Sequence, residues 1–184
     1  KIKDHGDNKV LLATNQGIYI LNVETRQSEK QLESLTTDFN ALNVTDVYYS
    51  DEKGWYITTN GNGFFIVDKD GTRHHYTEDL FQKGALLFDE VNLLFKDNSG
   101  TFWIGTQRGV STFDPENQSI LGAGPSGNPE KGIPTPSVWC FKESSDGNDI
   151  YIGTNSGVSK LNRETGLYTQ YYRKKDQSTY GTGE

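Results

Sequence analysis

The chain of 184 residues lacks methionine altogether and contains a single cysteine, Cys140. One cysteine excludes a disulfide within the chain and leaves the redox compartment open. No run of 18 apolar residues occurs, so the sequence predicts no membrane contact by this segment. It has no signal-peptide pattern either. Because methionine and hence an initiator residue are absent, we expect the chain to be a piece of a longer protein.

Basic residues are few relative to acidic ones. The chain has 18 Lys and Arg against 25 Asp and Glu, which gives a formal net charge of −7. Nucleic-acid binding requires a basic patch, and the nearest candidate, Arg173-Lys174-Lys175, is only three residues long. We therefore expect no nucleic-acid partner.

Glycine, by contrast, is abundant, and its spacing shows an internal repeat. The eight residues from Phe102 to Gly109 read Phe-Trp-Ile-Gly-Thr-Gln-Arg-Gly, and looser copies of them close at Gly17, Gly63 and Gly157. The closing glycines are thus 46, 46 and 48 residues apart. A period in the forties predicts a β-propeller or another stacked array, because one such repeat cannot bury its own apolar face.

Each repeat contains four short strand patterns separated by turns, as a propeller blade does. In the second copy these patterns cover residues 45–49, 55–59, 64–67 and 72–76. We therefore predict an all-β fold, a β-propeller segment of about four four-stranded blades that belongs to a larger ring. The predicted blades cover residues 1–39, 40–86, 87–134 and 135–184, and the first lacks most of its inner strand.

The repeated residues have structural roles in this interpretation. The closing glycines supply the positive φ that a tight turn needs. Gly105 and Gly153 make room for an aromatic ring of a neighbouring blade, and Trp55 and Trp103 belong to the core. One threonine in each copy is expected to form a hydrogen bond that defines the repeat: Thr14, Thr59, Thr106 and Thr154.

The segment from Val91 to Val110 closely resembles the two-component regulator propeller repeat. The third copy matches that repeat through Asp97, Gly100, Trp103, Ile104, Gly105, Thr106, Gly109 and Phe113-Asp114. The fourth copy has Tyr151 in place of the tryptophan, and the first two copies, with Leu11 and Tyr56 there, match more loosely.

The resemblance implies a seven-bladed propeller in the periplasmic, extracytoplasmic region of an inner-membrane protein. Such repeats occur in hybrid two-component histidine kinases of gut Bacteroidetes, where many respond to oligosaccharides. It implies that this segment is no enzyme although its parent is a histidine kinase. Its partners would be the remaining blades, the downstream domain and an oligosaccharide.

Residues suited to catalysis or metal binding have structural explanations in the sequence. Most acidic residues fall in repeated turns, where they bond to their own backbone. His74 and His75 are adjacent on a predicted strand, so they point to opposite faces and cannot share a metal. Cys140 lies between two aromatic residues and is expected to be a buried structural thiol. We predict no catalytic residue, no metal and no cofactor.

Ligand binding is expected in the loops between blades, because long loops on a rigid scaffold are where binding tends to reside. These loops are residues 37–43, 78–90, 122–137 and 173–184. The candidate ligand-binding residues are Trp139, Phe81, Lys83, Asn128 and Lys131. For Trp139 a packed core position is the alternative to stacking on a sugar.

Three functions remain open at this point. The first is a non-catalytic sensor segment; the second is a propeller enzyme, a lyase or glycosidase, whose site is shared between blades; the third is a structural spacer. A cluster of carboxylates and a basic residue at the ring centre would favour the enzyme, and an aromatic-lined groove with amide partners would favour the sensor. Exposed blade edges are also expected to pair with a second copy of the chain.

Overall fold

The computed structural model describes residues 1–32, 43–79, 82 and 84–172. These residues form sixteen β-strands in four antiparallel sheets, with no helix among them. Within each sheet the strands lie side by side in the order of the sequence, so every sheet is a four-stranded meander. This described part of the chain contains no helix long and apolar enough to cross a membrane.

Each sheet is one blade. Blade one consists of β1 (Ile2–Asp4), β2 (Lys9–Thr14), β3 (Gly17–Asn22) and β4 (Ser28–Lys30). Blade two consists of β5 (Val44–Ser50), β6 (Gly54–Thr59), β7 (Phe64–Asp68) and β8 (Arg73–Tyr76). Blade three consists of β9 (Val91–Lys96), β10 (Phe102–Thr106), β11 (Val110–Asp114) and β12 (Ser119–Ala123). Blade four consists of β13 (Val138–Glu143), β14 (Asp149–Thr154), β15 (Gly157–Asn162) and β16 (Tyr168–Tyr172).

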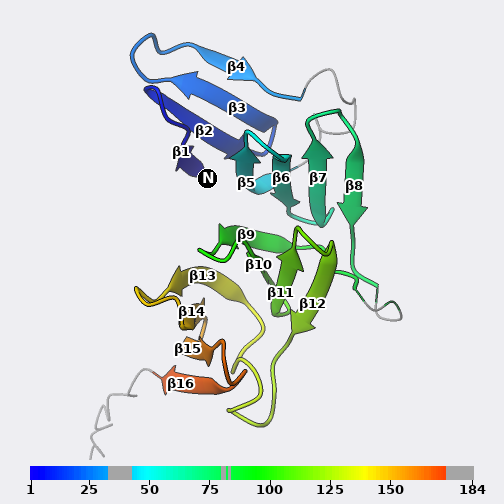
Figure 1. Cartoon of the computed structure of the whole chain (residues 1–184), viewed down its shortest axis with the longest axis vertical. Coiled ribbons are helices and arrows are strands. Elements are labelled where there is room, and N and C mark those ends of the chain that lie inside the picture. Colours follow the sequence, from blue (N-terminus) through cyan, green and yellow to red (C-terminus); the bar gives the residue numbers. More distant parts are fainter. Residues whose placement is uncertain (33–42, 80–81, 83, 173–184) are drawn as a thin grey trace, which may run out of the picture.

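The four blades follow one another along an arc (Figure 1). Their first strands, β1, β5, β9 and β13, lie on the concave side, and their last strands lie on the outside. Neighbouring sheets touch through the inner strands, as β5 does with β9 and β9 with β13. The predicted all-β propeller segment is thereby confirmed. A total of seven blades and the blade limits stay predictions.

The hydrophobic core is divided among the three interfaces between neighbouring blades. Ile57, Ile104 and Ile152 occupy the same place in the second strand of their blades and are fully buried. Between blades two and three, Tyr56 stacks on Phe102 with ring centroids 4.2 Å apart. Burying one such side chain stabilises a fold by about 1.5–3 kcal/mol. Each blade therefore depends on its neighbours for stability.

The turn after each second strand is built as the repeat predicts. The closing glycines have positive φ angles, 110° at Gly17, 72° at Gly63, 144° at Gly109 and 146° at Gly157. In each turn the preceding threonine donates its hydroxyl to the carbonyl of that glycine, at 2.8 Å for Thr14, 3.0 Å for Thr59, 2.9 Å for Thr106 and 3.1 Å for Thr154. The predicted hydrogen-bonding role of the threonines is confirmed.

Gly105 makes room for a ring of the next blade, as predicted. A Cβ at this position would lie 2.5 Å from Leu93 Cδ2 and 3.1 Å from Cε2 of Phe141, which belongs to blade four. The equivalent Gly153 faces the Sγ of Cys140 in its own blade instead. The small residue thus serves packing between blades at Gly105 and packing within one sheet at Gly153.

Cys140 is exposed, so the prediction of a buried thiol is wrong. It pairs across the sheet with Gly153, which is followed in the same row by Val158 and Tyr171, both exposed. The equivalent row of blade three is buried under blade four. Because no blade in the described part of the chain covers this face of blade four, the thiol faces solvent. We call the row of Cys140, Gly153, Val158 and Tyr171 the open face.

Candidate functional site

The inner strands of blades two, three and four carry a β-bulge near their beginning. The strand pairing shifts register there, and Thr45, Asn92 and Trp139 are the residues left without a partner across the sheet. A bulge redirects the side chain of its extra residue. The same position therefore presents a hydroxyl, an amide and an indole in three successive blades. Because these three groups differ while the scaffold repeats, they are candidates for a specific function.

Trp139 is exposed to 52%, so it does not pack in the core that the described blades form. Its indole Nε1 donates a hydrogen bond of 2.6 Å to Oδ1 of Asn155. The amide thus holds the orientation of the ring while the ring itself stays accessible. An aromatic ring fixed in this way can stack on the C–H face of a sugar without first being ordered.

A chain of amide side chains lies beside Trp139 at the border of blades three and four. Ser137 Oγ donates to Gln107 Oε1 at 2.8 Å, and Gln107 Nε2 donates to Asn92 Oδ1 at 3.0 Å. Asn92 Nδ2 in turn donates to the backbone carbonyl of Val138 at 2.8 Å. These amides are half-buried and mutually oriented, so they offer fixed donors and acceptors to a polar ligand.

The sequence carries a signal for these amides beyond the repeat residues to which a role is assigned above. The residue after the repeat threonine is an amide in all four copies: Asn15, Asn60, Gln107 and Asn155. In blade three that residue binds the bulged Asn92, and in blade four it binds the bulged Trp139. The turn amide therefore supports the bulged side chain of its own blade in both cases.

A groove of about 340 Å³ extends along the concave side next to Trp139. The inner strands of all four blades contribute to its lining. Asp46 is the carboxylate among the lining residues; it is 1% exposed and forms an ion pair with Lys3 at 2.8 Å. We call this cavity the axial groove. Glycoside hydrolysis by the usual mechanism uses two carboxylates, and the carboxylate of Asp46 is already engaged by Lys3.

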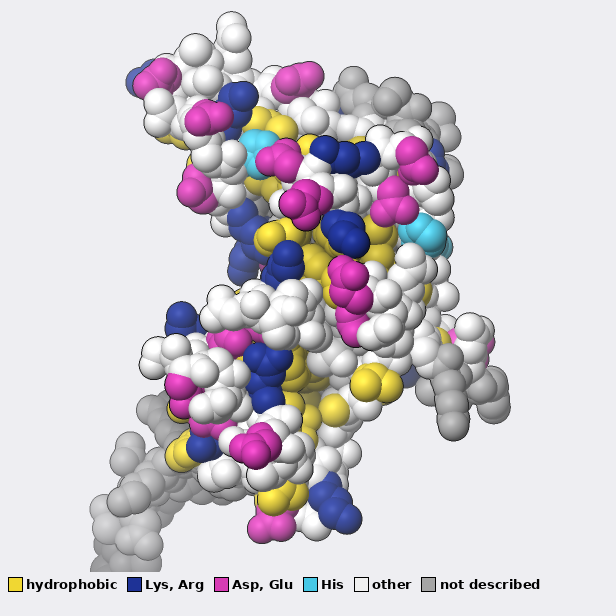
Figure 2. Space-filling view, in the orientation of Figure 1, with side chains coloured by type: hydrophobic (Ala, Val, Ile, Leu, Met, Phe, Trp, Pro, Cys, Tyr) yellow, Lys and Arg dark blue, Asp and Glu magenta, His cyan; other side chains and the backbone are white. Residues whose placement is uncertain are grey.

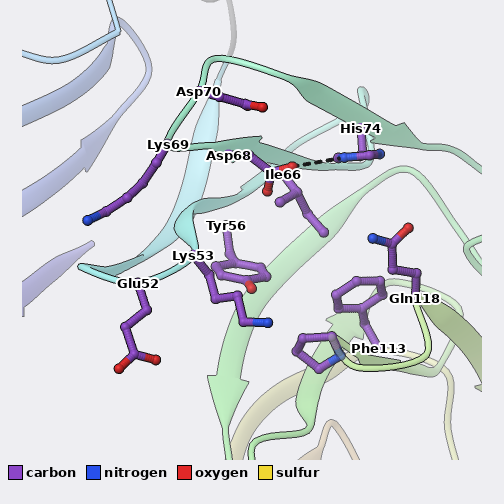
Figure 3. Close-up of a pocket in the computed structure, with 11 residues that line it drawn as sticks. Glu52, Lys53, Tyr56, Ile66, Asp68, Lys69, Asp70, His74, Phe113 and Gln118 are labelled. Carbon is purple, nitrogen blue, oxygen red and sulfur yellow. Dashed lines mark hydrogen bonds and ion pairs between the residues drawn. The ribbon is translucent and has the colours of Figure 1, made fainter.

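A second pocket, of about 400 Å³, lies between blades two and three (Figure 3). It is next to the turn that connects β5 to β6 and the turn that connects β7 to β8. Tyr56 and Phe113 contribute aromatic rings to its lining, and charged side chains surround them. His74 Nε2 lies 3.1 Å from Asp68 Oδ2. Lys53 forms an exposed ion pair with Glu116 at 3.3 Å. The lining of the pocket therefore combines aromatic rings with charged side chains, some of which are paired.

Burial raises the pKa of Tyr56, and the negative charge of Asp68 adds to the effect. The phenol consequently keeps its proton at neutral pH and serves as a hydrogen-bond donor, not as a base. This arrangement suits binding of a polar ligand more than proton abstraction.

Two of the predicted ligand-binding residues, Phe81 and Lys83, lie outside the described residues. Asn128 and Lys131 lie on segment 124–137, between β12 and β13, and both are exposed. They lie in a turn in which Asn128 accepts the backbone N–H of Glu130 at 2.9 Å.

Segment 124–137 packs against the outer strand of blade four. Gln170 Nε2 donates to the carbonyls of Pro129 at 3.0 Å and Gly132 at 2.6 Å. Ile133 is fully buried between blades three and four. The length of the segment thus serves to close this interface. The structure therefore does not bring Asn128 and Lys131 together with Trp139. They lie on the part of the segment that contacts the outermost strand of blade four, whereas Trp139 lies on the innermost strand, about 14 Å away across the sheet.

The arrangement of the blades is similar to that of solved extracellular domains from Bacteroides thetaiotaomicron. One is the extracellular domain assigned to a hybrid two-component system, with 17% identity, a TM-score of 0.72 and coverage of 94% of this chain. Another such domain from the same organism has 17% identity, a TM-score of 0.70 and coverage of 93%. An auxiliary nutrient binding protein from this organism has 12% identity, a TM-score of 0.60 and coverage of 94%.

At this level of identity the likeness shows the fold alone. The chain spans only 24%, 22% and 40% of the lengths of these three proteins. No family model and no curated protein matches the sequence. Membership in the two-component regulator propeller family thus stays an inference from the repeat residues.

Proposed function

We propose that these blades form a non-catalytic sensor segment in the extracytoplasmic region of a hybrid two-component histidine kinase, and that the ligand is an oligosaccharide. The observation that carries the proposal is the exposed ring of Trp139, held by Asn155 beside the oriented amides and the axial groove. The ring would stack on a pyranose, and the amides would bind its hydroxyl groups. Such a site matches the aromatic groove with amide partners expected of a sensor.

The structural neighbours support the same proposal. Two of these proteins are extracellular domains of two-component systems, and a third is a nutrient binding protein. The lining of the axial groove favours sensing over a lyase or glycosidase, because its carboxylate Asp46 is buried and paired with Lys3. A spacer without a ligand would have no need for an exposed, oriented indole.

The open face of blade four supports a further blade as a partner within the parent protein. Its row of small and apolar residues is equivalent to the row of blade three that blade four covers. A second copy of the chain is the alternative occupant of this face. Sedimentation of the chain at high concentration distinguishes these two, since a stable dimer would indicate the second copy.

Isothermal calorimetry of the full chain with a panel of neutral and acidic oligosaccharides tests the proposed function. Trp139→Ala should weaken the binding of any active sugar by about tenfold or more, because a stacked ring contributes on the order of 1–3 kcal/mol by analogy with other ring-stacking ligands. Tyr171→Ala is the matched control, since Tyr171 is an exposed aromatic residue on the open face. Unchanged binding by Trp139→Ala, or no binding by the wild type, would contradict the proposal.

A further inference from the structure

Lys96 lies at the end of β9, where two cavities meet. It lines both the axial groove and a smaller pocket of about 180 Å³ between blades two and three. Its ammonium lies 5.1 Å from the ring centroid of Tyr48 and 5.7 Å from that of Phe102. Within the described part of the chain, Lys96 forms no ion pair. Its ammonium is therefore placed against these two rings, and no described carboxylate lies at ion-pair distance from it.

The next interface shows what the same position does elsewhere in the chain. By strand register, the residue of blade four equivalent to Lys96 is Glu143. Glu143 is 7% exposed, accepts the backbone N–H of Asn98 at 3.0 Å and binds Arg163 at 3.1 Å. Arg163 also reaches Asp97 of blade three at 3.3 Å. Two carboxylates and one guanidinium thus close the interface between blades three and four.

Between blades two and three the same three positions have the opposite electrostatic character. The equivalents of Asp97, Glu143 and Arg163 are Ser50, Lys96 and Pro115. A hydroxyl and an ammonium replace the two carboxylates, and proline has no long side chain to cross the interface. All three residues line the smaller pocket, which remains open where the next interface is filled. The exchange therefore opens the space and leaves Lys96 at its border. Glu52, Asp114 and Glu116 also line this smaller pocket, so the excess of positive charge belongs to the axial groove, where lysines outnumber the carboxylate of Asp46.

The other lysines that line the axial groove or the smaller pocket are of two kinds. Some are paired with a carboxylate, and Lys1 is an additional positive charge of the groove. Lys3 is paired with Asp46 at 2.8 Å, and Lys53 is paired with Glu116 at 3.3 Å. Lys1 lines the groove as well, and Figure 2 shows Lys and Arg side chains bordering the concave side of the arc. A chain with a net charge of −7 therefore has a locally positive groove at its site.

We propose that the ligand of the axial groove is an acidic oligosaccharide and that Lys96 binds its carboxylate or sulfate group. The inference rests on the proposed function, because Trp139 in the same groove would bind the sugar ring. A charge-assisted hydrogen bond from Lys96 would distinguish an acidic sugar from its neutral analogue. The rings of Tyr48 and Phe102 beside the ammonium attract its positive charge and thereby favour this position of the side chain.

Calorimetry with tetragalacturonate and its fully methyl-esterified form tests the inference, because the two ligands share one sugar chain and differ at the carboxyl groups, which are anionic in the first and neutral methyl esters in the second. We expect the wild type to bind the acid at least about tenfold more tightly than the ester, which corresponds to about 1.4 kcal/mol. Lys96→Gln should remove this preference, and Lys96→Arg should retain most of it. Lys9→Gln, an exposed lysine of blade one outside both cavities, is the matched control and should change nothing.

A parallel titration with a sulfated galactan tetrasaccharide distinguishes the two anionic groups. Tighter binding of this sugar than of tetragalacturonate would indicate that Lys96 binds a sulfate group. Thermal unfolding without ligand verifies that each variant folds. Equal binding of acid and ester, unaffected by Lys96→Gln, would overturn the inference and leave the proposed function standing. Failure of the wild type to bind any of these sugars or the neutral panel would overturn both.

Discussion

Lys3 and Asp46 form an ion pair with an Nζ–Oδ1 distance of 2.8 Å, although they belong to different blades. Asp46 also accepts the backbone N–H groups of Val47 at 2.8 Å and Leu94 at 3.0 Å. Leu94 is in blade three, so one buried carboxylate connects the inner strands of three blades. Lys3 Nζ additionally donates to the carbonyl of Leu94 at 3.3 Å.

Asp46→Ala should lower the free energy of unfolding by about 3 kcal/mol, because it leaves two buried N–H groups without an acceptor and Lys3 without its partner. Urea denaturation followed by circular dichroism measures the change. Asp51→Ala is the control, since Asp51 is an exposed turn residue of the same blade. Equal losses in the two variants would contradict the bridging role of Asp46.

Arg163→Ala should destabilise the chain by about 3 kcal/mol, because Asp97 and Glu143 would remain as buried carboxylates without a counter-charge. The comparison is Lys53→Ala, which breaks an interblade ion pair whose side chains are 52% and 79% exposed. That exposed pair is expected to contribute less than about 1 kcal/mol. Urea unfolding of both variants tests the contrast, and a small loss for Arg163→Ala would refute it.

Gly105→Ala and Gly153→Ala form a matched pair at equivalent positions. The added methyl at Gly105 meets Leu93 and two residues of the next blade, so overpacking should cost about 2 kcal/mol. At Gly153 it meets the side chain of Cys140, which is exposed and can rotate away, so the loss should stay below about 1 kcal/mol. Thermal unfolding of both variants measures the difference, and a reversed order would refute the packing argument.

Alkaline pH should destabilise the fold through tyrosines that are buried or half-buried. Burial raises the pKa of Tyr56, Tyr76 and Tyr168 above the ordinary value of 10.0. The native state therefore holds these protons more tightly than the unfolded chain. This stability is fully present below about pH 10 and is lost as the pH rises through the raised pKa values. A urea midpoint at about pH 11 that equals the midpoint at about pH 8 would contradict this.

The thiol of Cys140 should react with a maleimide in the native chain without denaturant, because the side chain is exposed on the open face. Mass spectrometry should find one label per chain within minutes. Protection that grows with protein concentration would indicate that a second copy covers the open face. Protection at every concentration until denaturant is added would contradict the exposed position.

The repeat in the sequence was sufficient to predict the fold. Four copies of a glycine turn, each with a threonine at its start, fix the hairpins locally, because positive φ and a hydroxyl-to-carbonyl bond need only neighbouring residues. The packing role of Gly105 could also be predicted, because the repeat places a small residue at this position in every copy. The buried position expected for Cys140 failed because burial depends on the next blade, which no local pattern describes.

The sequence by itself determined the four-stranded blades and their turns, since strand period, turn chemistry and repeat spacing are properties of short segments. Only the tertiary structure decided the candidate site. It placed the bulged Trp139 in solvent, brought Lys3 to Asp46, and left a pocket where Pro115 stands in place of an arginine. These contacts join residues dozens of positions apart, and their geometry arises from how successive sheets rotate and pack, which the local pattern of each sheet leaves open.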